Sequence, residues 1–483
     1  MLSPGLALHT DKYQINMMYA HWLHGTHNRK AVFEAFFRKL PFGNGYAVFA
    51  GLERIVKYVE DLRFEESDLA YLREQEENYD PGFLEELRQF RFSGSLYSVR
   101  EGSLVFPGEP LVRVESRIFE AQLIETALLN FLNYQTLIAT KASRIRQVAK
   151  GDALMEFGIR RAQEADAALW GTRAVYLAGF DSTSNMLAGK LFGIPTEGTH
   201  AHSWVQSHES EEEAFRRYAT ALPDQVTLLV DTYDTLGSGV PHAIQIGLAM
   251  KRQGKSLRAV RLDSGDIAYL SIKTREMLDQ AGLTEVKIVA SNDLDEHTIL
   301  SLKVQGARVD AWGVGTQLIT AADQPTLGGV YKLVAREGED GAYVPTIKIS
   351  ANPEKVTIPG AKDIYRLIDK QTGKAIADYL CYPDERDIQE RAAIKLFHPN
   401  HPYISKQLDK YEAEPLLVPV FAEGKRVYDL PDLEEIRRYH REQLCLFWPE
   451  YLRMHNPEHY RVHLSEQVWK TRASLMQRYL DKT

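Results

Sequence analysis

Short apolar stretches alternate with longer amphipathic stretches through the middle third of the chain. The short stretches have the length of buried strands, and the longer ones repeat their apolar residues with the period of a helix. Repeated β-α units imply parallel strands, so we expect a closed or partly closed barrel rather than an open sheet. The predicted strands are Ala153–Phe157, Ala174–Ala178, Val226–Val230, Ala259–Leu262, Val286–Ala290 and Val309–Trp312. The predicted helices are Ser184–Leu191, Glu211–Thr220, Ala243–Gln253, Asp266–Ala281 and Asp293–Gln305.

The sequence on either side of this region has a more mixed pattern. Asp11–Trp22 and Phe119–Arg146 are predicted helices, and Ala31–Phe37 is a predicted strand. Short strands return after residue 330, and the tail from Leu430 is helical. We therefore expect an N-terminal α/β domain over residues 1–145 and a β/α barrel catalytic domain over residues 146–330. A C-terminal segment follows over residues 331–483 and ends in a helical tail.

Clusters of polar, chemically capable residues follow the apolar stretches of the middle third. Residues just past the carboxyl ends of parallel strands converge on one face, where ligands bind. Clusters far apart in the sequence are therefore expected to meet in a single pocket. They read Glu156-Phe157-Gly158-Ile159-Arg160-Arg161, Gly198-Thr199-His200-Ala201-His202, Asp231-Thr232-Tyr233-Asp234-Thr235, Arg261-Leu262-Asp263-Ser264-Gly265-Asp266, Ser291-Asn292-Asp293 and Gly313-Val314-Gly315-Thr316.

The composition narrows the class of protein. The chain has 483 residues, enough for two or three domains, and a formal net charge of -8, which gives no reason to expect nucleic-acid binding. Two cysteines, Cys381 and Cys445, indicate neither a disulfide framework nor a zinc cluster. The first residues do not resemble a secretory signal, and no apolar run approaches the roughly 18 residues of a membrane span. We expect a cytoplasmic protein with no membrane partner.

Two of the clusters have the chemistry of anion binding. Gly313 to Thr316 follow an apolar strand late in the series, where barrels often hold a phosphate; glycines let the backbone approach an anion and Thr316 adds a hydroxyl. Arg160 and Arg161 follow another strand, and paired guanidiniums suit phosphate or carboxylate groups. A tight turn and an exposed helix surface are the plainer interpretations of these two clusters.

The other clusters carry carboxylates and histidines. Asp263, two residues after Arg261, suits either ribose hydroxyls or a magnesium ion, and Asp266 suits the cap of the next helix. His202 has the chemistry of an acid, a base or a nucleophile, with a carboxylate such as Asp231 to orient its ring. Zinc is disfavoured because no third ligand with recognisable spacing lies near the histidines at 200 and 202. Each histidine and Asp231 also has a purely structural interpretation.

Taken in order, these clusters resemble the nicotinate phosphoribosyltransferase family. Any one motif is weak evidence, but the ordered set, which runs from about Thr10 to Gly360, is specific. The motifs are Thr10-Asp11-Lys12-Tyr13-Gln14, Phe33-Glu34-Ala35-Phe36-Phe37-Arg38, Glu156 to Arg161, Gly179-Phe180-Asp181-Ser182-Thr183-Ser184-Asn185, Gly198-Thr199-His200-Ala201-His202-Ser203, Arg261 to Asp266, Gly313 to Thr316 and Gly328-Gly329-Val330-Tyr331-Lys332.

The resemblance implies an α/β fold and a reaction. The fold would be an irregular β/α barrel of the type II phosphoribosyltransferase kind, with a second, smaller α/β domain built from the N- and C-terminal segments. The reaction would be the first step of NAD salvage, in which nicotinate and phosphoribosyl pyrophosphate give nicotinate mononucleotide and pyrophosphate. ATP hydrolysis would be coupled to turnover, so the implied cofactors are ATP and Mg²⁺. The implied assembly is a homodimer with shared active sites.

The resemblance also implies roles for individual residues. His202 would be the phosphorylated histidine, with Asp231 as its orienter and Asp263 as a third catalytic residue. Tyr13, contributed by the other subunit, and Phe157 would stack on the two faces of the pyridine ring. The remaining substrate contacts would be Ser184, Thr199 and Arg261, and the phosphate contacts would be Asp11, Arg38, Arg160, Gly315 and Thr316.

Three other functions fit part of this pattern. A nicotinamide phosphoribosyltransferase is the nearest, but the related nicotinamide enzymes carry an acidic residue where this chain has Ser184, and an acidic group would repel a carboxylate substrate. A quinolinate phosphoribosyltransferase would need extra cations for a dicarboxylate and offers no reason for ATP coupling. A non-catalytic sugar-phosphate sensor would not need Arg261, Asp263 and His202 together.

Overall fold

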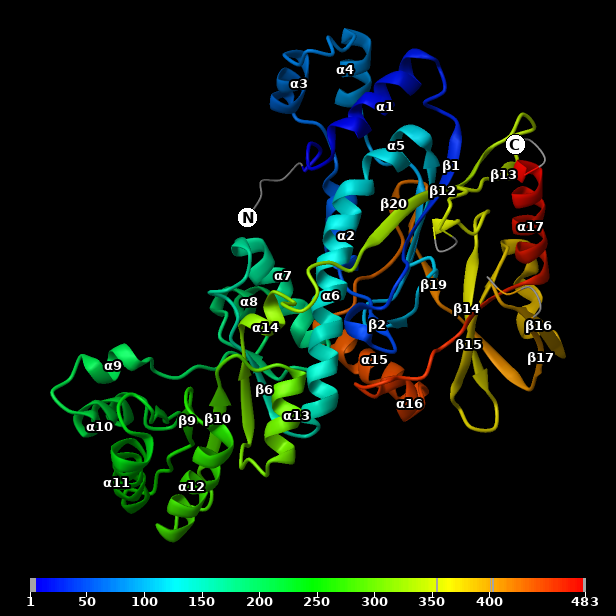
Figure 1. The fold of residues 1–483 in the computed structure, drawn as a ribbon. Helices are drawn as coiled ribbons and strands as arrows, with labels where there is room; N and C mark the ends of the chain where they lie inside the picture. Colours follow the sequence, from blue (N-terminus) through cyan, green and yellow to red (C-terminus); the bar gives the residue numbers. More distant parts are fainter. Residues whose placement is uncertain (1–5, 353–354, 400, 402–403, 481–483) are drawn as a thin grey trace. The chain divides into compact units, whose positions relative to one another are not determined.

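The computed structural model describes residues 6–352, 355–399, 401 and 404–480 (Figure 1). The chain forms two compact units, one of residues 1–140 and 326–483 and the other of residues 141–325. The boundary at residue 140 falls inside a single long helix, α6 (Glu125–Ala149). The N- and C-terminal segments thus share one unit, and this unit is the larger of the two rather than a smaller accessory domain.

Residues 141–325 form a parallel six-stranded sheet connected by helices. The strands are β6 (Ala153–Glu156), β7 (Ser182–Thr183), β8 (Thr227–Leu229), β9 (Ala259–Leu262), β10 (Lys287–Ser291) and β11 (Ala311–Val314). The helical segments are α7 (Glu164–Leu177), α8 (Met186–Phe192), α9 (His202–Gln206), α10 (Glu211–Ala221), η2 (Thr235–Gly239), α11 (Val240–Arg252), α12 (Ile267–Gln280), α13 (Glu296–Val304) and α14 (Thr316–Ile319). The strand order is β7-β6-β11-β10-β9-β8, and the sheet curls into half of a barrel, which confirms the predicted fold class.

One predicted strand is wrong. Residues Ala174–Ala178 lie at the end of α7, and the short strand β7 takes the expected place beside β6. The helix begins with Glu164 and Asp166 in its first turn, where negative charge stabilises a helix N-terminus. A short apolar run does not by itself distinguish a buried strand from the last turns of a buried helix.

Alternation along the strands determines which side chains share the concave site face. Met155, Ala259, Val289 and Ala311 pack in one apolar cluster, with Phe157 against it. Side chains two residues apart point to the same face of a strand, so the next positions on this face are 157, 261, 291 and 313. The face is therefore apolar along the strands and becomes polar at their carboxyl ends.

Residues 1–140 and 326–483 contain two larger sheets and a two-stranded one. The strands are β1 (Lys30–Phe37), β2 (Ala47–Val48), β3 (Ser95–Val99), β4 (Leu104–Val105), β5 (Val112–Arg117), β12 (Gly329–Glu337), β13 (Tyr343–Pro345), β14 (Asp363–Asp369), β15 (Ala375–Cys381), β16 (Ala393–Phe397), β17 (Ser405–Asp409), β18 (Tyr411–Pro415), β19 (Leu417–Ala422), β20 (Lys425–Arg426) and β21 (Val462–Leu464). The helical segments are α1 (Lys12–Leu23), η1 (Pro41–Gly43), α2 (Leu52–Asp61), α3 (Glu66–Arg73), α4 (Pro81–Arg88), α5 (Ile118–Leu123), η4 (Pro383–Gln389), α15 (Leu433–Leu446), α16 (Pro449–Leu452) and α17 (Glu466–Leu480).

The larger unit needs both ends of the chain. In the sheet ordered β13-β12-β1-β5-β3-β19-β20, strand β12 pairs with β1, which lies some three hundred residues earlier. A buried ion pair also joins β1 to the residue that precedes β14, because Lys362 Nζ lies 2.8 Å from Glu34 Oε2. Neither segment alone would satisfy the backbone groups along this sheet.

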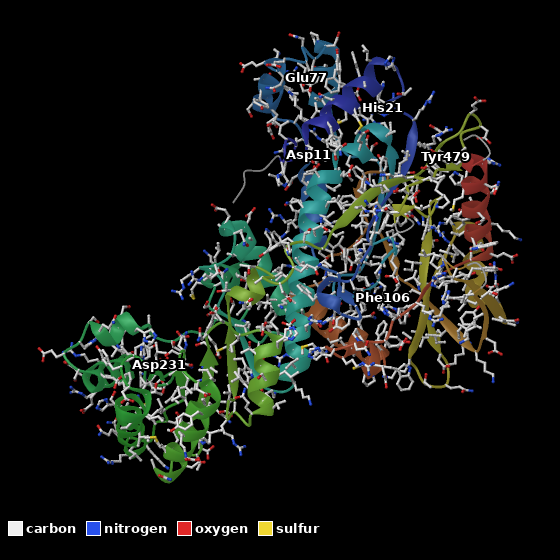
Figure 2. The ribbon with its side chains drawn as sticks, viewed as in Figure 1. Asp11, His21, Glu77, Phe106, Asp231 and Tyr479 are labelled. Carbon is white, nitrogen blue, oxygen red and sulfur yellow. The ribbon has the colours of Figure 1, made fainter. Side chains whose placement is uncertain are left out.

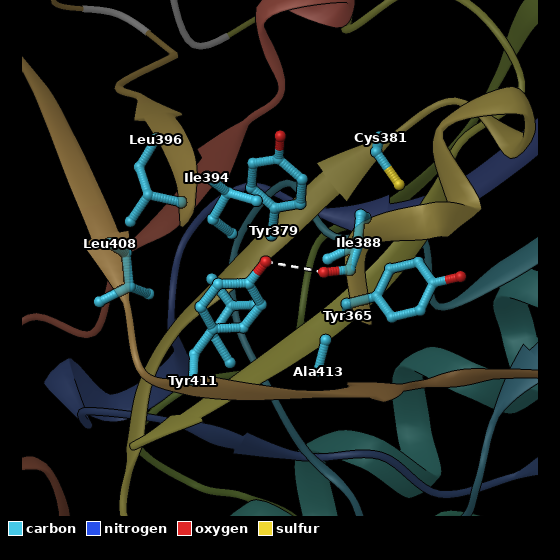
Figure 3. Close-up of a cluster of buried hydrophobic side chains, with 10 residues drawn as sticks. Tyr365, Tyr379, Cys381, Ile388, Ile394, Leu396, Leu408, Tyr411 and Ala413 are labelled. Atoms are coloured by element: carbon cyan, nitrogen blue, oxygen red, sulfur yellow. Dashed lines mark hydrogen bonds between the residues drawn. The ribbon is translucent and has the colours of Figure 1, made fainter. Parts of the chain in front are cut away.

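The other large sheet, ordered β17-β16-β21-β15-β14-β18, carries its own core (Figure 3). Tyr365, Tyr379, Ile388 and Tyr411 are buried in it, and the Tyr411 hydroxyl donates to the Ile388 carbonyl at 2.7 Å. The predicted helical tail contains α15, α16 and α17, but β21 lies between α16 and α17 and adds a strand inside this sheet. Within the described residues, no helix has the length and apolar character needed to cross a bilayer.

Candidate active site

Arg261 lies at the centre of the polar end of the half-barrel. Its Nε donates to Ser291 Oγ at 2.8 Å, and its Nη1 donates to Thr199 Oγ1 at 2.9 Å. Its Nη2 donates to Asp263 Oδ1 at 2.7 Å. The guanidinium carbon is 5.5 Å from the centre of the Phe157 ring, within the range of a cation–π contact. All three guanidinium nitrogens donate hydrogen bonds, so the acceptors around them fix the plane of the group.

Asp263 is held as a carboxylate. Burial opposes its ionisation, but hydrogen bonding from the Ser291 hydroxyl and the charge of Arg261 outweigh burial and keep the pKa of Asp263 below its ordinary value. The Ser291 hydroxyl and Arg261 both bind Oδ1, and Oδ2 lies 3.8 Å from His202 Nε2. The site therefore contains a cation and an anion in direct contact, with Oδ2 facing the histidine.

His202 is the first residue of α9. Its ring is oriented by Thr232 and not by Asp231, the residue expected from the sequence. Its Nδ1 lies 3.1 Å from Thr232 Oγ1. Asp231, labelled in Figure 2, uses Oδ2 to accept the backbone N–H of Asp263 at 2.9 Å and the Ser264 hydroxyl at 2.6 Å. Thr232 therefore replaces Asp231 as the ring's orienter, and Asp231 holds the loop after β9. The physical reason is that successive residues after a strand point in different directions, and position 232 is the one that faces the ring.

The second Asp231 oxygen has an unusual environment. Oδ1 is buried and has no hydrogen-bond partner within the part of the chain that the structure describes. A buried carboxylate oxygen normally has a partner. This oxygen is available to a donor or a cation brought by a ligand.

His200 has a structural role. Its Nε2 accepts the backbone N–H of Leu229 at 3.1 Å, while Nδ1 lies 3.3 Å from the Ala201 carbonyl. Burial lowers the pKa of His200 to about 4, so the ring is neutral at physiological pH. His200 therefore has a structural role, whereas the His202 side chain is 40% exposed and is available for chemistry.

The Phe157 ring packs directly against the backbone of β11. A Cβ added at Gly313 would lie 2.6 Å from two carbons of this ring, and one added at Gly315 would lie 3.2 Å from the Phe157 carbonyl oxygen. The glycine at 313 is therefore required by the aromatic ring. Gly315 immediately precedes α14, which begins at Thr316, so the expected phosphate turn lies beside the ring.

Arg160 and Ser184 lie on the neighbouring segments. Arg160 is exposed on the turn after β6. Ser184 lies between β7 and α8, and its backbone N–H donates to the Glu156 carbonyl at 2.9 Å. Both residues thus flank the end of β6, which carries Phe157.

Three of the expected residues belong to the larger unit. Asp11 precedes α1 and accepts the Thr126 hydroxyl at 2.9 Å. Tyr13, in the first turn of α1, is 49% exposed. Arg38 follows β1, and its Nε is buried without a hydrogen-bond partner among the described residues.

Two residues at the site were given no role by the sequence pattern. Ser291 links Arg261 to Asp263, and Thr232 contacts His202. Period-two alternation along β10 could have indicated Ser291, which shares a face with Val289, whereas along β8 it favours position 231 and gives no signal for Thr232. Groups of three or more His, Cys, Asp or Glu residues arranged for a metal ion do not occur among the described residues.

The fold and these side chains define a β/α-barrel protein of the type II phosphoribosyltransferase kind. Profiles of nicotinate phosphoribosyltransferases match nearly the whole chain: the N-terminal domain matches residues 8–133, the family profile residues 153–370 and the C-terminal domain residues 361–472. The chain belongs to the nicotinate phosphoribosyltransferase family.

Individual relatives agree with this assignment. Nicotinate phosphoribosyltransferase of Bacillus subtilis is 54% identical over 97% of this chain and 94% of its own length. The human protein of the same name is 34% identical over 95% and 94%, respectively. The crystal structure of human nicotinic acid phosphoribosyltransferase has a TM-score of 0.86 at 32% identity and covers 96% of this chain and 99% of its own. A nicotinate-nucleotide pyrophosphorylase from Pyrococcus furiosus shares the fold, with a TM-score of 0.70 at 24% identity over 92% and 96%.

Proposed function

We propose that this chain is a nicotinate phosphoribosyltransferase that joins nicotinate to phosphoribosyl pyrophosphate and releases pyrophosphate. The observation that carries the proposal is the setting of Arg261. A guanidinium fixed by three acceptors, beside an aromatic ring and an ionised carboxylate, suits a planar anionic ring and a phosphorylated sugar. Relatives that carry this name over nearly their whole length support it.

The proposed reaction requires little proton chemistry. The lone pair of the pyridine nitrogen forms the N–C bond to the anomeric carbon, and the electrons of the breaking C–O bond leave with pyrophosphate. The attacking nitrogen carries no proton, so no general base is needed. The protein must instead align the ring and stabilise charge on the leaving group. Phe157 suits the first task, and Arg160 with the turn at Gly315 and Thr316 suits the second.

Nicotinate rather than nicotinamide is the proposed acceptor. Arg261 lies beside the Phe157 ring and donates to Thr199, and these two residues suit the carboxylate of nicotinate. Ser184 offers a hydroxyl and no negative charge. An acid-bearing substrate is therefore attracted by the arginine and is not repelled at position 184.

His202 is the proposed point of ATP coupling. In the tautomer that donates Nδ1–H to Thr232, the ring has its Nε2 lone pair free to attack the γ-phosphorus of ATP. The new N–P bond replaces the bond to the ADP oxygen, and ADP leaves. Coupling requires that phosphorylated and unmodified His202 interact differently with two states of the site, and Asp263, 3.8 Å away, is the group whose interaction would change.

Magnesium would be bound with the substrate phosphates. Mg²⁺ commonly uses one or two protein carboxylates together with phosphate oxygens and water, so it does not require an all-protein cluster. Asp263 is ionised and suits this role, as does the unpartnered oxygen of Asp231. Bound there, the ion would neutralise charge on pyrophosphate.

A second copy of the chain is the proposed source of Tyr13. The ring is 49% exposed on α1, where Met17 is also 40% exposed. Large exposed apolar side chains on one helix face are typical of surfaces that contact a partner. Asp11 and Arg38 of the same unit would then reach the substrate phosphates of the neighbouring site.

Pyrophosphate release tests the proposal. Purified protein with phosphoribosyl pyrophosphate and nicotinate should release pyrophosphate, and ATP should increase the rate. His202→Gln should retain a basal rate and lose the increase; Gln preserves much of the size of the ring without its nucleophile. An undiminished ATP effect in this variant would contradict the phosphohistidine. Absence of release under either condition would favour a sugar-phosphate sensor.

A further inference from the structure

Glu156 is a buried carboxylate that the proposed reaction does not use. It is the last residue of β6, and only 1% of it is exposed. Since neighbouring side chains on a strand point to opposite faces, Glu156 points away from Phe157 and towards α7. Burial raises the pKa of its carboxyl group. Burying a carboxylate is unfavourable unless both oxygens are hydrogen-bonded, so this residue type at this place requires an explanation.

Three neutral donors surround the Glu156 carboxylate. The backbone N–H of Gly158 donates to Oε1. The Thr183 hydroxyl donates to Oε2 at 2.6 Å, and the Thr172 hydroxyl, which is shared with the Ala168 carbonyl at 2.7 Å, lies 3.1 Å from the same oxygen. Both threonines are only 1% exposed. The donors come from the turn after β6, from β7 and from α7, so one side chain connects three segments.

These segments carry Phe157 and Ser184, two of the residues of this chain that are proposed to hold the pyridine substrate. Gly158 follows Phe157 directly. Thr183 precedes Ser184, whose own N–H donates to the Glu156 carbonyl at 2.9 Å. The Thr183 oxygen also accepts the N–H of Asn185 at 2.9 Å, and Asn185 caps α8. The separation between Phe157 and Ser184 is therefore set through Glu156.

The opposite half of the site is supported by other contacts. Arg261 and Asp263 are held by Ser291, and the backbone of Asp263 is held by Asp231. None of these contacts involves Glu156. Loss of the Glu156 network should therefore disturb the positions of Phe157 and Ser184 and leave Arg261 and Asp263 in place.

We propose that Glu156 is a positioning residue for the pyridine substrate, acting through Phe157 and Ser184. This inference rests on the proposed nicotinate phosphoribosyltransferase activity and adds to it a division of labour. Glu156 sets the geometry of ring binding and does not touch the reacting atoms. Substitutions in its network should accordingly change KM for nicotinate more than KM for phosphoribosyl pyrophosphate.

The test uses Glu156→Gln and a matched pair at Thr183 in the full-length protein. Gln keeps the shape but replaces one of the two acceptor oxygens with an NH2 group, so either the Gly158 N–H or the threonine hydroxyls lose their acceptor. Thr183→Val removes the same hydrogen bond from the other side, whereas Thr183→Ser retains the hydroxyl. We expect Glu156→Gln and Thr183→Val to raise KM for nicotinate roughly tenfold, with KM for phosphoribosyl pyrophosphate changed less than about twofold. Thr183→Ser should behave like the wild type.

Measurements of stability and of nicotinate binding distinguish a positioning role from a loss of folding. Thermal unfolding midpoints are measured for each variant, and nicotinate binding is measured by calorimetry. Equal changes in both KM values, or a lower midpoint with unchanged KM values, would overturn the positioning role while leaving the activity intact. A wild type that neither binds nicotinate nor turns it over would overturn the proposed function and this inference together. If Glu156→Gln does not fold, the Thr183 pair decides.

Discussion

Replacing Arg261 with lysine separates its charge from its geometry. Lysine keeps the positive charge but has one nitrogen in place of the three that bind Ser291, Thr199 and Asp263. Lysine can keep one of these contacts and loses the other two. Charged hydrogen bonds contribute about 1.5 kcal/mol each at the lower end of their range, so the two lost contacts amount to about 3 kcal/mol. The lower end applies because the side chain is 18% exposed and water replaces part of each contact. We expect kcat/KM for nicotinate to fall roughly a hundredfold.

Arg258→Lys is the matched control for this experiment. Arg258 precedes the same strand and also binds two partners, Gln225 at 2.8 Å and Glu197 at 2.6 Å, but its side chain is 49% exposed. Exposed pairs of this kind contribute about 0–1 kcal/mol, so kcat/KM should change less than about twofold. Steady-state pyrophosphate release measures both variants, with thermal unfolding as a folding check. Wild-type kcat/KM in Arg261→Lys, or an equal loss in Arg258→Lys, would refute the reasoning.

Two further predictions concern packing and pH. Gly313→Ala places a Cβ 2.6 Å from the Phe157 ring, so KM for nicotinate should rise about fivefold or more, at an overpacking cost of about 1 kcal/mol or above. Gly151→Ala, which meets nothing within 4 Å, should leave KM unchanged, and equal effects at both glycines would count against the ring contact. Burial lowers the pKa of His200 and His440 to about 4 from 6.5, so the folded state favours neutral rings. Their stabilisation is complete above pH 6.5 and is lost as pH falls towards 4, by up to about 3 kcal/mol per pH unit for two protons. The urea midpoint should fall over this range, and a constant midpoint would contradict the burial of these rings.

The sequence predicts the half-barrel well where one signal dominates. Ala259–Leu262 was predicted from its apolar run and coincides with β9. The strand predicted at Ala174–Ala178 was wrong, because this apolar run belongs to the end of a helix whose buried face is also apolar. The meeting of Arg261 and Asp263 with Ser291 followed from their place at strand ends, since parallel strands bring such residues to one edge. Thr199 instead lies in an irregular segment after an isolated bridge at Thr196, and it joins them through Arg261.

Individual contacts could not be predicted in the same way. Thr232 rather than Asp231 faces His202, because the direction of each side chain after a strand depends on backbone angles that the pattern does not encode. Glu156 meets partners 16 and 27 residues away, and only the register of β6 against β7 and the packing of α7 bring them together. A buried carboxylate within an otherwise apolar strand was the one available signal.

The central claim is that the strand-end site of the half-barrel transfers a phosphoribosyl group to nicotinate. It is tested most directly by quantifying nicotinate mononucleotide and pyrophosphate formed by the wild type and by Asp263→Asn, with nicotinate or nicotinamide as acceptor. We predict both products in equal amounts from nicotinate, a much lower kcat/KM for nicotinamide, and a strong loss of both products in Asp263→Asn. Preference for nicotinamide, or undiminished turnover in Asp263→Asn, would contradict the account.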